Sequence, residues 1–222
     1  MLALNHKQHY LQVALNRSLA EVERMIGLLP ASERIILEAG TPFIKRYGQR
    51  GIKALVNWWS FKLGQPGYVV ADLKCMDRGA AEARMAADAG ASAVTCLGLA
   101  PAETLNRFIL ECQNTGLDSM IDMLNVEFPL QVLGSLQQLP KLAVVHLGVD
   151  ESHNQDKEIY FQHIQQIKEA YDIMISAAGC ETLKQAGQAI FNDSDIAVVW
   201  RPFYDNPQKM AELANEFLKE IR

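Results

Sequence analysis

Short apolar runs alternate with longer amphipathic segments along the whole chain. Each apolar run is long enough for a buried strand, and the spacing between runs matches a strand followed by a helix. Eight such units in 222 residues predict a compact α/β fold, a single-domain (β/α)8 TIM barrel over residues 1–222. A doubly wound open sheet is the alternative. The eight expected strands are 10–15, 34–38, 68–73, 91–96, 117–122, 142–146, 172–176 and 195–199.

Signals for helix ends support this division of the chain. Ser18 and Glu21 have the spacing of a capping box, and Pro30 ends the amphipathic run that follows them. Gly90 and Gly116 each follow a segment rich in helix-forming residues, where glycine commonly terminates a helix. We therefore expect helices between the apolar runs.

Composition excludes several classes of function. The net charge is −5, the sequence pI is near 5.6 and no block of Lys or Arg occurs, so a nucleic-acid surface is not expected. No apolar run approaches the length of a membrane span, and the amino-terminal segment lacks the apolar core of a secretory signal. Four cysteines without C-x-x-C spacing predict reduced, buried thiols in a cytoplasmic protein: Cys75, Cys96, Cys112 and Cys180.

Polar residues close or follow most of the apolar runs. In a (β/α)8 barrel the chemistry lies at the carboxyl ends of the strands, so these residues are the candidates for a functional site. The alternative explanation is that strand ends are polar because they meet water. The residues are Asn16, Glu38, Asp72, Lys74, Asp122, His146 and Arg201.

The segment 68–79 carries the densest group of charges at a strand end. Asp72 and Lys74 are two residues apart, so on a strand they share one face, and Asp77 follows in the loop. A buried charge is costly unless a partner or a metal compensates it. The segment is consistent with an ordinary ion pair of Asp72 with Lys74, and equally with a catalytic cluster.

The pattern Asp72-x-Lys74-x-x-Asp77-x-Gly79 resembles the catalytic signature of the orotidine monophosphate decarboxylase superfamily. The glycine after the second Asp resembles the branch of 3-hexulose-6-phosphate synthase and 3-keto-L-gulonate-6-phosphate decarboxylase. The segments 11–16, 38–42 and 145–150 are similar to the first, second and sixth strands of this branch. Val149 stands where the decarboxylases usually carry Arg, which favours the synthase.

The resemblance implies a role for each residue of the signature. Glu38 and Asp72 would help to hold Mg2+, a hard cation that prefers carboxylates and water. Lys74 would add positive charge beside the same substrate oxygens, and His146 would transfer the proton. Asp77 would reach into the neighbouring active site of a homodimer.

Phosphate recognition is where the chain departs from the family pattern. The family places Gly-Gly after the seventh strand and Gly-Arg after the eighth, whereas this chain has Ala178-Gly179 and Trp200-Arg201. Asn16 replaces the usual Asp after the first strand. The substrate-binding residues implied by the resemblance are Asn16, Glu38, Gly179, Trp200 and Arg201.

The expected function is that of a Mg2+-dependent aldehyde-lyase acting on a sugar phosphate. It would join formaldehyde to ribulose 5-phosphate, or release it, through an enediolate. One alternative is a decarboxylase of a 3-keto-sugar acid phosphate, which would protonate the same type of intermediate. Another is a non-catalytic barrel that binds a ligand or partner, for which Asn16, Ala178 and Trp200 are the evidence.

Overall fold

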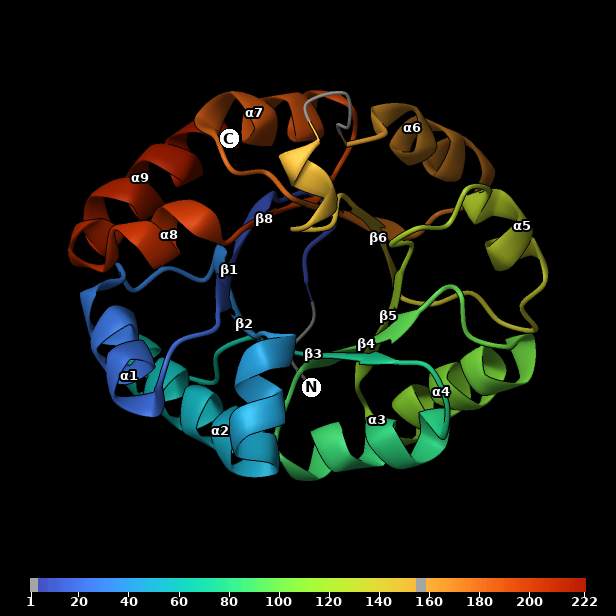
Figure 1. The fold of residues 1–222 in the computed structure, drawn as a ribbon, viewed down its shortest axis with the longest axis horizontal. Helices are drawn as coiled ribbons and strands as arrows, with labels where there is room; N and C mark the ends of the chain where they lie inside the picture. Colours follow the sequence, from blue (N-terminus) through green and yellow to red (C-terminus); the bar gives the residue numbers. More distant parts are fainter. Residues whose placement is uncertain (1–3, 155–158) are drawn as a thin grey trace.

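The computed structural model describes residues 4–154 and 159–222 and contains a closed barrel of eight parallel strands (Figure 1). Each strand pairs with the next in chain order, and β1 pairs with β8 to close the barrel. The predicted TIM barrel is confirmed, and the open-sheet alternative is wrong. The strands are β1 Tyr10–Leu15, β2 Ile35–Ala39, β3 Val69–Cys75, β4 Ala93–Leu97, β5 Asp118–Asp122, β6 Leu142–His146, β7 Met174–Ala178 and β8 Ile196–Val199.

Helices surround the barrel on the outside, as Figure 1 shows. The longest, α2, is kinked at Gly48, where φ is 55°. The α-helices are α1 Leu19–Leu28, α2 Thr41–Leu63, α3 Gly79–Asp88, α4 Ala102–Thr115, α5 Pro129–Gly134, α6 Phe161–Ala170, α7 Leu183–Phe191, α8 Arg201–Asp205 and α9 Met210–Glu220. Two short 3-10 helices are η1 Glu151–His153 and η2 Pro207–Lys209.

The predicted helix ends are confirmed. The backbone N–H and the hydroxyl of Ser18 both donate to Glu21 Oε2, at 3.1 and 2.5 Å, which is the capping box at the start of α1. Gly116 caps α4 with a φ of 77°, and Gly90 follows α3 with a φ of 82°. Only glycine adopts this left-handed backbone without a steric cost, so the sequence signal has a direct physical cause.

The strand bounds differ from the prediction in particular places. β3 runs to Cys75, beyond the expected end, because its pairing with β4 shifts register between Ala71 and Cys75. β8 begins after Asp195, whose carboxylate instead accepts hydrogen bonds from the Ile175 backbone N–H at 2.6 Å and from Lys168 at 2.7 Å. Side-chain contacts of this kind leave no trace in the hydrophobic pattern.

The hydrophobic core has two layers. One fills the space between the strands and the helices, and the other fills the interior of the barrel. Leu4 belongs to the interior layer together with Tyr10, whose hydroxyl accepts a hydrogen bond from the Asn5 N–H at 2.8 Å. The amino-terminal segment therefore closes the end of the barrel where the strands begin, and the opposite end is left for the site.

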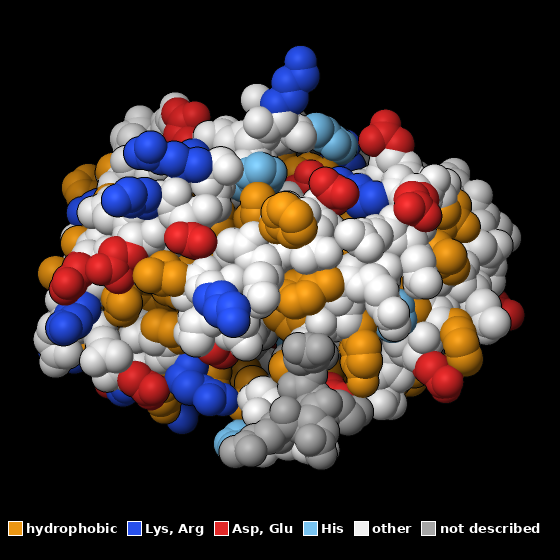
Figure 2. Space-filling view, turned by 90° about the horizontal axis from the view of Figure 1, so that it is seen from above, with side chains coloured by type: hydrophobic (Ala, Val, Ile, Leu, Met, Phe, Trp, Pro, Cys, Tyr) orange, Lys and Arg blue, Asp and Glu red, His pale blue; other side chains and the backbone are white. Residues whose placement is uncertain are grey.

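Other expectations from composition can be compared with the structure. All four cysteines are free and buried, as predicted. In the described part of the chain, we find no helix with the length and hydrophobicity needed to cross a bilayer. On the face displayed in Figure 2, acidic and basic side chains are interspersed rather than separated by sign.

Candidate active site

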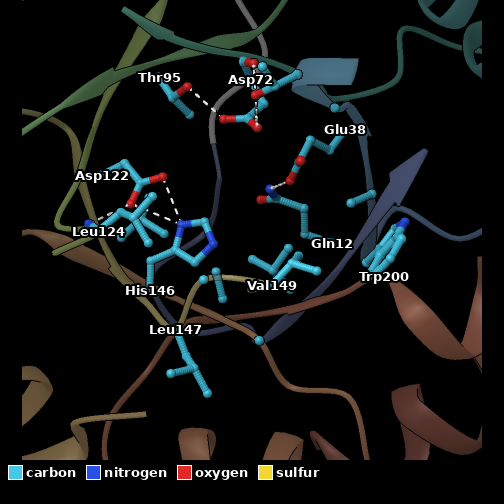
Figure 3. Close-up of a pocket in the computed structure, with 18 of the residues that line it drawn as sticks. Gln12, Glu38, Asp72, Thr95, Asp122, Leu124, His146, Leu147, Val149 and Trp200 are labelled. Atoms are coloured by element: carbon cyan, nitrogen blue, oxygen red, sulfur yellow. Dashed lines mark hydrogen bonds and ion pairs between the residues drawn. The ribbon is translucent and has the colours of Figure 1, made fainter. Parts of the chain in front are cut away.

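A cavity of about 500 Å³ lies at the carboxyl ends of the strands, and all eight strands contribute residues to its lining. Figure 3 shows the polar side chains converging on it from several strands. Most of the candidates from the sequence line this cavity, which is the arrangement that the barrel predicts. They are Asn16, Glu38, Asp72, Lys74, Asp122, His146, Gly179, Trp200 and Arg201.

Asp72 is held on both of its carboxylate oxygens. Thr95 donates its hydroxyl hydrogen to Oδ1 at 2.8 Å, and Thr41 donates to Oδ2 at 2.7 Å. Lys74 Nζ contacts the same Oδ2 at 2.6 Å. The expected ion pair is present, but Lys74 Nζ also lies 3.4 Å from Asp122, so it bridges two carboxylates. A lysine shared in this way fixes positive charge inside the cavity.

Lys74 has an unusual backbone. Its φ is 47°, a left-handed value that side-chain-bearing residues adopt at a cost of roughly 1–3 kcal/mol. Its N–H donates to Thr95 Oγ1 at 2.9 Å, within the irregular pairing of β3 and β4. Burial alone would lower the pKa of Lys74, but the Asp72 and Asp122 carboxylates raise it above its ordinary value. Lys74 is therefore a permanent cation at neutral pH.

His146 and Asp122 form a second pair, from β6 and β5. His146 Nδ1 lies 2.8 and 3.0 Å from the two carboxylate oxygens of Asp122. The Leu124 N–H donates to Asp122 Oδ1 at 3.0 Å and helps to orient the carboxylate. With Nδ1–H donating to Asp122, the other ring nitrogen, Nε2, is left on the cavity side (Figure 3).

The two charges of this pair stabilise each other. Burial alone would lower the pKa of His146, but the Asp122 carboxylate raises it above its usual value. Burial would raise the pKa of Asp122, but His146 and Lys74 lower it. Asp122 is thus an anion over the whole neutral range, and His146 is a stronger base than a free imidazole.

Glu38 lies beside Asp72 in a region rich in oxygen atoms. Gln12 Nε2 donates to Glu38 Oε2 at 2.5 Å. Burial, and then the nearby charge of Asp72, raises the pKa of Glu38 to about 7. Gln12 Oε1 and Asn16 Oδ1 are buried and have no hydrogen-bond partner among the described residues. Two adjacent carboxylates and two unpaired amide oxygens are a surrounding that a cation would stabilise.

The donor set of this region fits Mg2+. No group of three or more His, Cys, Asp or Glu side chains in residues 4–154 and 159–222 converges on one point. A cation between Glu38 and Asp72 would therefore take two carboxylates from the protein and complete its shell with water or ligand oxygens. Mg2+ commonly binds in this way, through one or two carboxylates with several waters retained.

The opposite wall of the cavity is formed by residues that follow β8. The Trp200 ring packs against the Tyr204 ring, with 5.1 Å between centroids, and its buried Nε1 has no partner among the described residues. Arg17 lies over the Tyr204 ring at 4.1 Å and donates to the Tyr204 carbonyl at 2.6 Å. Arg201 Nη2 donates to Ser152 Oγ at 3.3 Å. Trp200 is thus packed against Tyr204, and Arg17 in turn packs against Tyr204.

Asp77 is the one sequence candidate that does not line the cavity. Its side chain is exposed, and its Oδ1 accepts a hydrogen bond from the Arg78 N–H at 2.7 Å. Arg78 has a left-handed φ of 58° and precedes the first residue of α3. Asp77 therefore has no role within the cavity of its own chain as the structure stands.

Sequence reasoning missed several residues of the site. Asp122 was a candidate from its place at the close of an apolar run, but its contacts with His146 and Lys74 give no signal in the sequence. The hydroxyls of Thr41 and Thr95 give no signal, because their contacts with Asp72 depend on how neighbouring strands are registered. Glu181, whose Oε2 accepts a hydrogen bond from the Arg201 N–H at 2.7 Å, also lines the cavity and was not a candidate.

Comparison with known families agrees with this geometry. Residues 9–215 match the orotidine 5'-phosphate decarboxylase / HUMPS family. This chain belongs to that family. The match covers all eight strands, so the family assignment and the site concern the same residues.

Proteins that are similar to this chain include known enzymes. The bifunctional enzyme Fae/Hps of Methanocella arvoryzae is 38% identical over 217 residues, which are 96% of this chain and 53% of that protein. The chain thus spans about half the length of the curated relatives it matches. The crystal structure of 3-hexulose-6-phosphate synthase from Salmonella typhimurium has a TM-score of 0.84 and 25% identity, and the match covers 96% of this chain and 98% of that one.

A second solved structure supports the fold alone. It is a ligand complex of KGPDC from Streptococcus mutans, with a TM-score of 0.76 and 20% identity. The match covers 96% of this chain and 98% of that one. The barrel of this family member is therefore shared with both the synthase and KGPDC.

Proposed function

We propose that the chain is a Mg2+-dependent aldehyde-lyase of the 3-hexulose-6-phosphate synthase type. The observation that carries the proposal is the coupling of two networks in one cavity. Asp72 and Lys74 form one network, Asp122 and His146 form the other, and Lys74 Nζ contacts the carboxylates of both. A base beside a fixed cation is the arrangement needed to remove a proton next to a carbonyl group.

His146, Asp122 and Lys74 each have a different role in the proposed reaction. His146 Nε2 accepts the proton from carbon 1 of ribulose 5-phosphate, and Asp122 holds the ring and stabilises the imidazolium that forms. Carbon 1 of the resulting enediolate then attacks formaldehyde, which forms the new carbon–carbon bond. The formaldehyde oxygen takes up the proton from His146. Lys74 stays protonated throughout and stabilises the negative charge on the sugar oxygens.

A Mg2+ ion held by Glu38 and Asp72 would supply Lewis-acid stabilisation of the same oxygens. The hydroxyls of Thr41 and Thr95 would keep the Asp72 carboxylate in place for this purpose. The phosphate of the substrate would lie toward Arg201 and Gly179, at the far side of the cavity. This assignment leaves the unpaired oxygens of Gln12 and Asn16 available to the ion's water ligands or the sugar hydroxyls.

Two observations bear on the alternatives. Val149 lines the cavity and is 47% exposed, so the place where the decarboxylases usually carry Arg holds no charge here, which favours the synthase over the decarboxylase. The His146–Asp122 pair supports a catalyst over a non-catalytic barrel, because it places an imidazole with a raised pKa at the wall of the cavity, beside the Lys74 cation.

We also propose a homodimer in the cytoplasm. Asp77 is exposed beside Met76, which is 46% exposed, and Leu99, after the neighbouring strand β4, is 47% exposed. Exposed apolar side chains such as these contribute to the buried centre of an interface when a second copy covers them. A second copy would cover them and bring Asp77 to its neighbour's cavity. Four free, buried thiols suit a reducing compartment.

The test is formaldehyde-dependent consumption of ribulose 5-phosphate by the purified protein. We expect turnover with Mg2+, loss of turnover in EDTA, and loss in Lys74→Ala. Release of CO2 from 3-keto-L-gulonate 6-phosphate, without formaldehyde fixation, would support the decarboxylase instead. A folded protein that performs neither reaction would contradict an enzymatic role with these substrates.

A further inference from the structure

Arg201 is the cation that a ligand's distal anion would meet in this cavity. Among the described residues that line it, Lys74 and Arg201 are the only Lys or Arg side chains. Lys74 already contacts the carboxylates of Asp72 and Asp122, so its charge is compensated by the protein. An anionic group on a bound molecule is therefore best stabilised at Arg201.

The carboxylate of Glu181 lies next to Arg201. It follows β7, and Arg201 follows the adjacent strand β8, so the two loops lie side by side. Glu181 Oε2 accepts the backbone N–H of Arg201 at 2.7 Å, and both residues line the cavity. Burial raises the pKa of Glu181, while the Arg201 N–H and guanidinium oppose that rise, so this carboxylate responds to the groups that would hold a ligand's anion.

A carboxylate and a phosphate cannot both use this position without a cost. The Arg201 N–H can donate one good hydrogen bond, and two anions a few ångströms apart repel each other. A ligand with a neutral hydroxyl end meets no such repulsion. Glu181 is only partly buried, and a glutamate side chain can adopt several staggered rotamers, so binding of a phosphate requires only a change of rotamer at this position.

We propose that Glu181 is an internal anion that competes with the distal anionic group of a ligand for Arg201. It is a specificity-determining residue, because it weakens binding of a dianionic group relative to a neutral one. A phosphate-bearing ligand binds with Glu181 turned out of the position. The competition rests on the geometry of Glu181 and Arg201, and only the choice of ribulose 5-phosphate as a probe rests on the proposed function.

The first experiment measures binding of inorganic phosphate by calorimetry. Glu181→Gln removes the charge and keeps an amide oxygen that can accept the Arg201 N–H. Glu23→Gln, on the exposed face of α1, removes the same charge away from the cavity and is the matched control. We expect phosphate to bind about tenfold more tightly to Glu181→Gln than to wild type, and equally to Glu23→Gln and wild type. Equal or weaker binding to a folded Glu181→Gln overturns the proposal.

A second experiment compares ribulose with ribulose 5-phosphate as ligands. In the wild type, we expect the phosphate to improve affinity by less than about tenfold, and Glu181→Gln should widen the difference between the two sugars. A wild type that gains more than about tenfold from the phosphate contradicts the competition, even if no variant folds. Because both experiments measure binding, they stand whether or not the protein fixes formaldehyde.

Discussion

At the scale of single residues, the contact of Asp122 with His146 determines how the site responds to pH. A base must be unprotonated to accept a proton, so activity should rise as the pH rises through the pKa of His146. Asp122 raises that pKa. Replacing Asp122 with Asn should therefore move the acid limb of the pH–rate profile to lower pH, and should also reduce kcat by about 10²–10⁴-fold because the ring loses its orientation.

The check on Asp122→Asn is a pH–rate profile of both proteins. Asp118→Asn is a useful comparison, because Asp118 begins the same strand and its carboxylate instead accepts a hydrogen bond from the Tyr68 hydroxyl at 2.6 Å. An acid limb that stays in place in Asp122→Asn would contradict the role of this carboxylate.

Glu38 gives a second prediction at this scale, which concerns the metal. The carboxyl of Glu38 has a pKa of about 7, so below that pH it carries a proton that a cation must displace. Affinity for Mg2+ should fall by up to about tenfold for each pH unit below 7, and Glu38→Gln should abolish the dependence. Calorimetric titration of Mg2+ at several pH values measures it, and a flat wild-type profile would exclude Glu38 as a ligand.

The raised pKa of Glu38 also makes the stability of the metal-free protein depend on pH. A raised carboxyl pKa means that between pH 4.5 and about 7 the folded protein binds more protons than the unfolded chain. The contribution of Glu38 to stability is therefore present below the unfolded pKa and is lost as the pH rises through that range. Thermal melts in EDTA should show the decline in wild type, and a smaller one in Glu38→Gln.

Prediction from sequence succeeded at residues whose position follows from strand alternation. Asp72 and Lys74 are expected on one face because they are two residues apart, and both line the cavity. The pattern could not reveal Thr95 as a partner of Asp72, because that contact needs the β3–β4 register. Nor could it reveal Glu181, whose hydrogen bond joins two loops.

At the scale of elements, Gly79 shows what a residue of the signature does for packing. A Cβ atom at Gly79 would lie 2.6 Å from the Thr104 carbonyl oxygen and 2.8 Å from Phe108 Cβ, both in α4. Close approach of α3 and α4 therefore requires glycine. Gly79 is therefore required for helix packing as well as being part of the family signature.

Gly79→Ala should lower the free energy of unfolding by about 1–3 kcal/mol, because the helices must separate. In a chain of this size each kcal/mol corresponds to about 2–4 °C in Tm. Gly27→Ala is the matched control, since Gly27 lies within α1 and a Cβ there would meet nothing within 4 Å. It should leave Tm unchanged or raise it slightly. Equal melting curves for the two variants would contradict the packing argument.

Helix positions were well predicted because their ends carry chemical signals. α4 begins at Ala102 and ends before Gly116, as glycine in its left-handed conformation indicates. The extra length of β3 was not foreseen, since a left-handed Lys74 breaks the regular pairing without changing the apolar pattern.

At the scale of the whole molecule, the barrel could be predicted because eight apolar runs admit few other arrangements. A parallel strand followed by a helix returns to the same sheet with a fixed hand, so eight units close on themselves. The oligomeric state could not be predicted in this way, because it depends on the complementarity of two surfaces, which the hydrophobic pattern of the sequence does not show. The homodimer therefore remains a prediction that needs its own measurement.

Subunit mixing tests that prediction. If Asp77 acts in the neighbouring subunit, coexpressed Lys74→Ala and Asp77→Ala chains should regain about a quarter of wild-type activity, since half of the dimers would have one intact site. Each variant alone should be nearly inactive. Sedimentation analysis provides the mass of the assembly. If a verified mixed dimer recovers no activity, Asp77 acts in the active site of its own chain or has no part in catalysis.

Hydrogen exchange reports directly whether a base in this cavity deprotonates a ketose phosphate. Ribulose 5-phosphate is incubated with the protein and Mg2+ in D2O without formaldehyde, and the signal of the carbon 1 hydrogens is followed by NMR. We expect loss of one of these hydrogens in wild type, and its retention in His146→Ala and in EDTA. Retention in wild type, by folded protein that binds the sugar phosphate, would contradict this expectation.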